Sequence, residues 1–267
     1  MRNLPAYDQI IQGLSGVMSI TGDAKTAPFR VGYPMADTIG GITAAFAIAG
    51  ALAARGKEPQ APGCFIDVSM LEAVLATMGW VVSNYLIAGK EPEPLGNENF
   101  TASPSGTFRT RDGLLNISAN KQQQFEAVCR VLARPQLAAD PRFAERQARL
   151  KHRFELRALL EEALAAAPAA EWAERLNAAG VPAGCVLSVP EALAQPQVRE
   201  RGLIATFKDA PGVGHDIRVV RVGFKLDGQA PHVDAPPPRL GEHNREVLAG
   251  LGCSAAEIEE LQRSALA

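Results

Sequence analysis

The spacing of apolar residues changes several times along the chain, and each change predicts a different element. Residues 5–18 predict a helix, because apolar side chains recur there at helical intervals at Tyr7, Ile10, Ile11, Leu14 and Val17. The long apolar stretch behind Asp37 predicts a second helix, from Thr38 to about Arg55. Residues 64–69 alternate and predict a strand, and residues 70–86 predict a third helix.

The middle of the chain changes composition. Residues 89–106 carry three prolines and no apolar period, which is typical of a linker. Residues 106–119 predict two strands around a turn at Asp112 and Gly113. Further helices are expected at 121–132, 141–167, 169–179, 190–194, 244–251 and 255–266, and a further strand at 218–226.

Strands and helices therefore lie on both sides of a mostly helical middle. The fold class this order predicts is α/β. Residues 1–99 and 191–267 are expected to form an open α/β large domain. Residues 100–190 are expected to form a smaller α+β domain inserted into it.

Charge and length exclude several classes of partner. The 267 residues include 27 Lys and Arg against 29 Asp and Glu, a net charge of −2, which argues against nucleic acid as the main partner. The N-terminus has no apolar signal core. The apolar run 40–54 is too short for a bilayer, which needs about 20 residues, so a buried helix is expected there. We therefore predict no membrane partner and a cytoplasmic location.

The residue pattern does not favour a metal site or a serine-hydrolase triad. The four cysteines form no CxxC pair, and the four histidines show neither metal-ligand nor triad spacing. Neither GxGxxG nor GxxxxGK[ST] occurs. We expect reduced thiols, no metal site and no permanently bound cofactor.

Asp37 leaves two interpretations open. Aspartate is a favoured helix N-cap, where its carboxylate accepts a backbone N–H. A carboxylate beside Gly40 and Gly41 can also act as a nucleophile, because the glycines let a substrate approach the backbone closely. The two roles are compatible.

The order of several segments resembles one family over about residues 5–262. The segments include "YDQIIQGLSGVMSITG", "VGYPMADTIGGITAAFAIAGALAARG", "FIDVSMLEA", "GTFRTRDGLLNISANKQQQFEAVCRVL" and "PPPRLGEHNREVLAGLG". Together they resemble the class III CoA-transferases, the CaiB/BaiF type, which include formyl-CoA and carnitine CoA-transferases and 2-methylacyl-CoA racemases.

The resemblance implies a reaction for Asp37. In the transferases, the aspartate before the glycine-containing helix is the nucleophile, and it forms first a mixed anhydride and then an enzyme–CoA thioester. A coenzyme A thioester and a carboxylic acid are then the substrates. Small dicarboxylic acids such as succinate are expected by analogy.

Other positions separate the branches of the family. The racemases need a histidine immediately before the acidic residue of the first helix, and this chain has Tyr7 before Asp8. Since tyrosine titrates near 10, it is a poor base, and the transferase is favoured over the racemase. Tyr7 and Asp8 are then expected either to line the substrate pocket or to form a half-buried helix face. Asn97 either borders the substrate or belongs to a polar linker.

Family members usually carry a further N-terminal segment that resembles half of a nucleotide-binding fold and contacts CoA. The sequence printed here starts after it, which leaves three interpretations: a shortened product, a chain that works with a separate N-terminal half, or a misassigned start. The resemblance also implies an interlocked homodimer. A non-catalytic fragment that needs a partner chain stays an alternative.

Overall fold

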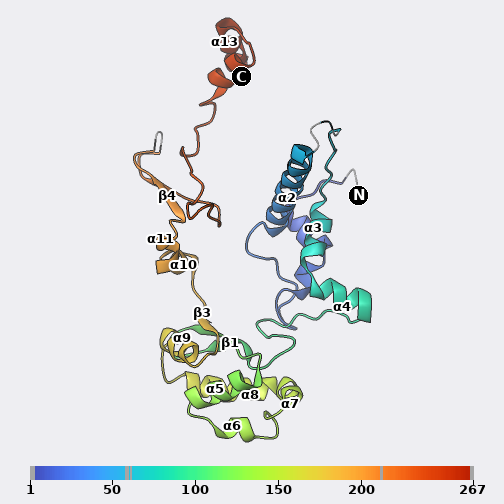
Figure 1. Ribbon diagram of the computed structural model, residues 1–267, viewed down its shortest axis with the longest axis vertical. Coiled ribbons are helices and arrows are strands. Elements are labelled where there is room, and N and C mark those ends of the chain that lie inside the picture. Colours follow the sequence, from blue (N-terminus) through green and yellow to red (C-terminus); the bar gives the residue numbers. More distant parts are fainter. Residues whose placement is uncertain (1–3, 58–59, 61, 211–212, 265–267) are drawn as a thin grey trace. The chain divides into compact units, whose positions relative to one another are not determined.

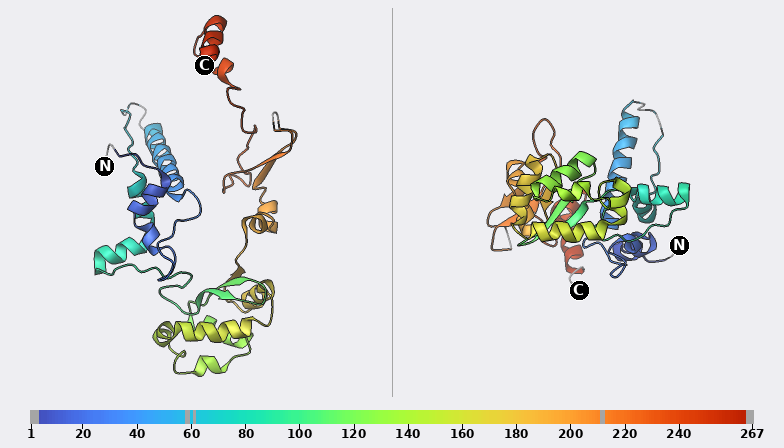
Figure 2. Two further views of the ribbon diagram at one scale, coloured as in Figure 1. Left: turned by 180° about the vertical axis from the view of Figure 1, so that it is seen from behind. Right: turned by 90° about the horizontal axis from the view of Figure 1, so that it is seen from below.

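The computed structural model describes residues 4–57, 60, 62–210 and 213–264. The chain divides into two compact units, Met1–Val186 and Leu187–Ala267. Figures 1 and 2 show the course of the chain through each unit.

The first part of the N-terminal unit is helical. Its elements are α1 (Asp8–Leu14), the 3₁₀ helix η1 (Val17–Ile20), α2 (Met35–Lys57), α3 (Met70–Thr77) and α4 (Trp80–Ala88). The predicted helix over 5–18 is shorter than expected, because Gly16 adopts a left-handed conformation with φ of 79° that ends it. A small core joins α1, α2 and α3 through Ile11, Val17, Met35, Ala36 and Val74.

Two predictions in this part are wrong. The strand expected over residues 64–69 is not formed, because no described segment pairs with their backbone, and Phe65 is 93% exposed. The helix expected over 70–86 is two helices, α3 and α4, bent by 82°. Gly79 lies at the break with φ of 52° and ψ of −115°, a conformation that favours glycine.

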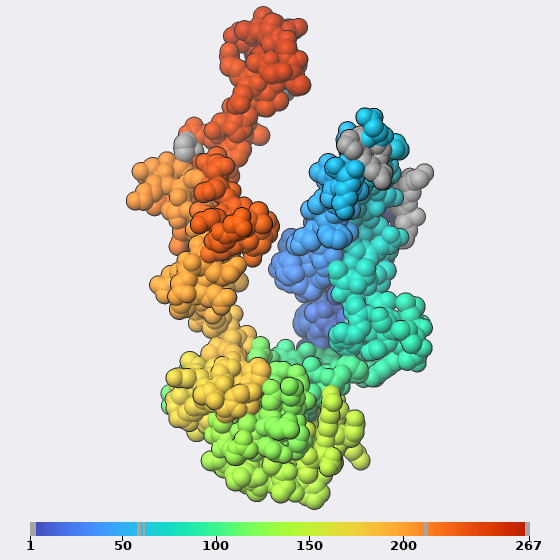
Figure 3. All heavy atoms as spheres, viewed as in Figure 1, coloured from blue at the N-terminus to red at the C-terminus, as the bar shows by residue number. Residues whose placement is uncertain are grey.

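The surface of α2 also differs from the prediction of a buried helix. Within the described residues, α1 and α3 make the main packing contacts with it, and large apolar side chains are exposed at Ile42, Phe46, Ile48 and Leu52. The blue spheres of α2 are uncovered on the face shown in Figure 3. At 23 residues, α2 has the length and composition to cross a membrane, contrary to the length argument above. Core helices of soluble proteins pass the same test.

The second part of the N-terminal unit is a small antiparallel sheet covered by helices. The strands are β1 (Ser105–Arg109), β2 (Leu114–Ser118) and β3 (Ala183–Cys185), in that order in the sheet. The helices are α5 (Gln122–Val131), α6 (Gln136–Ala139), α7 (Arg146–Lys151), α8 (Arg153–Leu164) and α9 (Ala169–Ala178). Their core is formed by fully buried side chains such as Phe108, Leu115, Phe125, Leu156 and Leu160.

The hairpin, α5 and α9 confirm the sequence predictions closely. The single helix expected over 141–167 is instead α7 and α8, separated at His152. The short strand β3 was not predicted, because three residues carry too little alternation to be recognised. It pairs with β2 in the register Leu115 to Cys185.

The second unit contains short elements. They are α10 (Val189–Leu193), α11 (Pro196–Glu200), the antiparallel pair β4 (Ile204–Phe207) and β5 (Ile217–Val220), α12 (Asn244–Gly250) and α13 (Ala255–Ser264). Strand β4 was missed, and the strand expected over 218–226 ends at Val220. The predicted end of the last helix at residue 266 lies outside the described residues.

The mixture of helices and strands confirms the broad fold class. Both sheets of the described residues are antiparallel, with three and two strands. The predicted domain limits at 99 and 191 stay a prediction.

We predict that Arg149 is required for the stability of the 105–185 part. Its guanidinium is buried and donates to Ser103 O at 3.0 Å, Phe143 O at 2.8 Å and Ala144 O at 2.9 Å. Arg149→Met leaves these carbonyls without their donor, so the free energy of unfolding should fall by about 3 kcal/mol. Urea unfolding followed by circular dichroism measures this change. The control Arg130→Met, at an exposed position, should stay close to wild type.

Candidate active site

The first turn of α2 is held by a carboxylate from another helix. Asp8 Oδ1 accepts the backbone N–H of Ala36 at 2.7 Å and that of Asp37 at 3.4 Å. The residue before α2 is Pro34, whose side chain has no group that accepts a hydrogen bond. Asp8, on α1, therefore satisfies backbone donors that a local N-cap would otherwise serve.

The structure thereby corrects the N-cap interpretation of Asp37. Helix α2 begins at Met35 rather than Thr38, so Asp37 lies inside the first turn and not at the cap. Its backbone N–H faces Asp8, and the residue is exposed. No described group donates a hydrogen bond to its carboxylate. A helix N-terminus stabilises negative charge, so this turn suits an ionised side chain.

Gln12, which was not singled out in the sequence, ties Asp8 to the segment before α2. It is fully buried on α1. Its Nε2 donates to Asp8 Oδ2 at 2.7 Å and to Tyr33 O at 3.3 Å, while its Oε1 accepts the N–H of Val31 at 2.9 Å. The only sequence signal was a polar residue beside Ile11 on a helix that is otherwise expected to bury apolar positions.

The two glycines of α2 play different parts. A Cβ on Gly40 would lie 3.1 Å from Met70 Cγ, so this glycine lets α3 pack closely against α2. Gly41 is exposed, and apart from its own helix backbone no described atom lies within 4 Å of a Cβ added to it, so this part of the α2 surface is uncovered. The predicted role of these residues in substrate binding stays a prediction.

Tyr7 and Asp8 differ in their exposure to solvent. The Tyr7 side chain is 79% exposed, and its carbonyl accepts the N–H groups of Ile10 and Ile11 at the start of α1. Asp8 is half-buried between α1 and α2. The structure thus brings Asp8, Asp37 and Gly40 to one end of α2, with Tyr7 preceding them at the surface.

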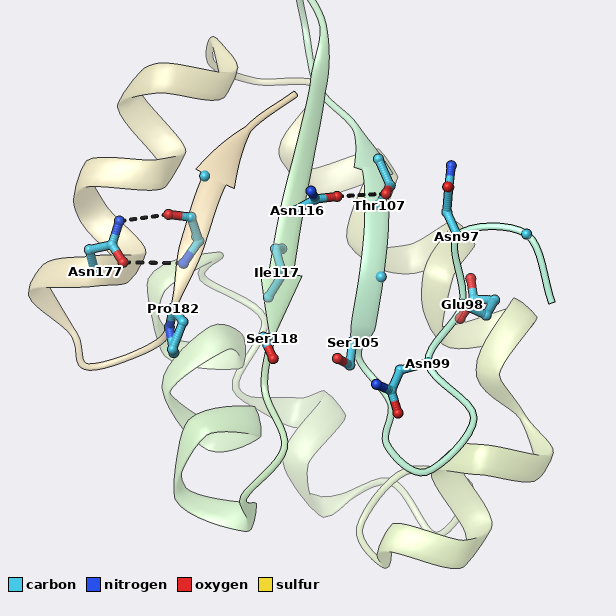
Figure 4. Close-up of a pocket in the computed structure, with 14 residues that line it drawn as sticks. Asn97, Glu98, Asn99, Ser105, Thr107, Asn116, Ile117, Ser118, Asn177 and Pro182 are labelled. Carbon is cyan, nitrogen blue, oxygen red and sulfur yellow. Dashed lines mark hydrogen bonds between the residues drawn. The ribbon is translucent and has the colours of Figure 1, made fainter. Parts of the chain in front are cut away.

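Asn97 lies in a different place, in a cavity of about 550 Å³. Figure 4 shows the polar side chains that line it, among them Thr107 on β1, Asn116 on β2 and Asn177 on α9. Thr107 Oγ1 donates to Asn116 Oδ1 at 2.6 Å. A Cβ on Gly106 would lie 2.5 Å from Asn97 O, so only glycine allows this close approach. Asp37 does not line this cavity.

Arginines of α7 and α8 hold the segment that carries Asn97. They contact backbone carbonyls: Arg146 that of Thr101, Arg149 that of Ser103, Arg153 that of Asn99 and Arg157 that of Thr107. Arg157 also forms an ion pair with the largely buried Glu98 carboxylate. The linker expected over 89–106 is therefore fixed to the small sheet at its end.

Metal ligation is not seen in the part of the chain that the structure describes. Within residues 4–57, 60, 62–210 and 213–264, no three His, Cys, Asp or Glu side chains are grouped to hold a metal ion.

The chain belongs to a family of transferases. The profile described as CoA-transferase family III matches residues 1–244, so this chain is a member of that family. The resemblance seen in the sequence motifs is thereby confirmed.

Named relatives and solved structures agree. The chain is 35% identical over 243 residues to acetyl-CoA:oxalate CoA-transferase of Acetobacter aceti, covering 91% of this chain and 60% of that protein. It is 35% identical over 267 residues to succinate–glutarate CoA-transferase of Agrobacterium fabrum, with 97% and 62% covered. A CaiB/BaiF family protein from Brucella suis matches with a TM-score of 0.79 and 31% identity over 92% of this chain and 63% of that one. The chain thus spans about 60% of the length of these relatives.

We predict that Asp8→Ala lowers the free energy of unfolding by about 1–2 kcal/mol. The substitution leaves the Ala36 N–H without its acceptor and removes one of the three partners of the buried Gln12 amide. Urea denaturation followed by circular dichroism measures the loss. Asp67→Ala is the matched control, since Asp67 is exposed outside any helix. Equal stability of the two variants would show that Asp8 does not cap α2.

Proposed function

We propose that this chain takes part in CoA transfer between an acyl-CoA and a carboxylic acid, with Asp37 as the nucleophile. The observation that carries the proposal is an exposed carboxylate in the first turn of α2, on a backbone that Asp8 holds in place. Membership of CoA-transferase family III and the names of the relatives support the reaction class.

The reaction proceeds by exchange of acyl bonds at Asp37. Its carboxylate attacks the thioester carbonyl, the CoA thiolate leaves, and a mixed anhydride forms. The thiolate then attacks the Asp37 carbonyl of the anhydride, which releases the donor acid and leaves a CoA thioester on Asp37. The acceptor carboxylate attacks this thioester and frees the thiolate again. In the last step the thiolate attacks the acceptor's carbonyl, which yields the new acyl-CoA and restores Asp37.

Several features of the chain support individual steps of this reaction. A carboxylate is ionised at neutral pH, so attack needs no general base. Oxyanions form at each step and need backbone donors nearby. The exposed surface at Gly41 leaves room for a thioester at the same end of α2. CoA is a substrate here, and the proposal includes no permanently bound cofactor.

Small dicarboxylic acids are the proposed acid substrates. Two relatives are named for oxalate and for succinate and glutarate. We also propose a cytoplasmic location and a homodimer, or a complex with a separate N-terminal half. The proposed arrangement is an open α/β large domain of residues 1–99 and 191–267 with residues 100–190 inserted.

Two alternatives have specific observations attached. A 2-methylacyl-CoA racemase would need a base before Asp8, and the exposed phenol of Tyr7 is a weak one. A non-catalytic fragment that needs a partner chain is favoured by the uncovered apolar side chains of α2 and by Trp80, Leu86 and Ile87 on α4.

We predict that the purified chain transfers CoA from succinyl-CoA to glutarate or oxalate, and that Asp37→Asn reduces the rate to background. The amide lacks the anionic oxygen that attacks the thioester. Chromatography of the CoA esters measures the transfer. Asp67→Asn, which removes an exposed carboxylate elsewhere, should keep the wild-type rate. Equal activity of Asp37→Asn and wild type would exclude Asp37 as the nucleophile.

A further inference from the structure

The hydrogen bonds around Gln12 go beyond those needed to bury an amide. Gln12 is fully buried, and each of the three hydrogen bonds of its side chain leads to a group that builds the start of α2 or caps it. Its Nε2 faces two acceptors, the Asp8 carboxylate and the Tyr33 carbonyl, and its Oε1 faces one donor, the Val31 N–H. This partner set fixes which end of the amide is nitrogen.

The chain of contacts continues from Gln12 to Asp37. Gln12 holds Asp8 Oδ2, and the other carboxylate oxygen, Oδ1, accepts the N–H groups of Ala36 and Asp37. A charged acceptor makes these bonds stronger than neutral ones. The orientation of the Asp37 backbone is therefore determined by an amide one helix away.

We propose that Gln12 is a positioning residue for the nucleophile. It fixes the Asp8 carboxylate on the first turn of α2 and anchors the 31–33 segment before that turn, so that Asp37 points in one direction. This inference rests on the proposed function of Asp37. Gln12 itself does not contact the reacting atoms.

The apolar packing around these bonds makes them effective. Ile11, Met35 and Ala36 are buried in the core that joins α1 to α2, and the Gln12 side chain on α1 is fully buried as well. Because Gln12 is fully buried, its amide is shielded from water, and its loss removes a hydrogen-bond partner from the half-buried Asp8 carboxylate and from the Val31 N–H. The first turn of α2 should then loosen without unfolding of the chain.

Amide hydrogen exchange tests the positioning without any reaction. In Gln12→Met, which keeps the side-chain length and an apolar fit, the N–H groups of Val31 and Ala36 should exchange at least about tenfold faster. Leu160 in α8 should exchange at the wild-type rate. Gln9→Met on the exposed side of α1 is the control and should change none of these rates. Unchanged exchange at Val31 and Ala36 in Gln12→Met would overturn the proposal.

Kinetics test whether the positioning matters for catalysis. The kcat of CoA transfer should fall about tenfold in Gln12→Met, with the KM for acyl-CoA little changed, because misdirection of the nucleophile affects the reaction more than binding. Faster exchange with an unchanged kcat would show a merely structural role. A wild-type chain without transfer would contradict the proposed function, whereas the exchange rates would still decide whether Gln12 holds this turn.

Gln12→Glu adds a signature that loss of stability cannot imitate. The introduced carboxylate faces Asp8 and repels it when ionised, whereas the protonated carboxyl can donate to Asp8 as the amide does. The kcat of this variant, relative to wild type, should therefore rise as pH falls from 8 to about 5.5. A constant ratio over that range would contradict the proposed hydrogen bond.

Discussion

The hydrogen bond between Asp8 and the first turn of α2 determines how the candidate active site is built. Helix α2 starts after a proline, so its leading N–H groups have no local side-chain acceptor. A carboxylate 28 residues earlier supplies it, at 2.7 Å from the Ala36 nitrogen. Because Asp8 caps the helix, the carboxylate of Asp37 is not needed for that role; it is exposed, and no hydrogen bond to it is formed within the described residues. One acidic residue thus takes the structural role, and its neighbour in space remains available for chemistry.

A second constraint acts on the small sheet. Four arginines on α7 and α8 donate to carbonyls of residues 99–107 and thereby fix the segment that lines the polar cavity. The buried guanidinium of Arg149 forms no ion pair with a carboxylate among the described residues, and burial lowers its pKa. Backbone carbonyls and the face of Phe125 surround it instead. Asn97 therefore lies on a rigid edge, in a part of the unit with its own core.

The sequence predicted what depends on local pattern. The hairpin around Asp112, helices α5 and α9 and the acidic residue at the start of α2 follow from periodicity and turn residues. It did not predict the features that depend on distant partners. Gly79 divides a continuous apolar run, and residues 64–69 stay unpaired because a strand needs a neighbour. Asp37 was placed at the cap, since a carboxylate supplied from α1 cannot be read from local spacing. The role of Gln12 could not be predicted for the same reason, since two of its partners, Val31 and Tyr33, lie about 20 residues further along the chain.

Whether Asp37 is the nucleophile can be tested by identifying the carboxylate that the substrate modifies. The chain is incubated with succinyl-CoA without an acceptor acid, treated with borohydride, digested under mild acid and analysed by mass spectrometry. A CoA thioester on Asp37 is reduced by borohydride to the alcohol, and we expect this product in the peptide that contains Asp37 and not in Asp37→Asn. Reduction at Asp8 instead, or transfer of CoA with Asp37 unmodified, would show that Asp37 is not the nucleophile.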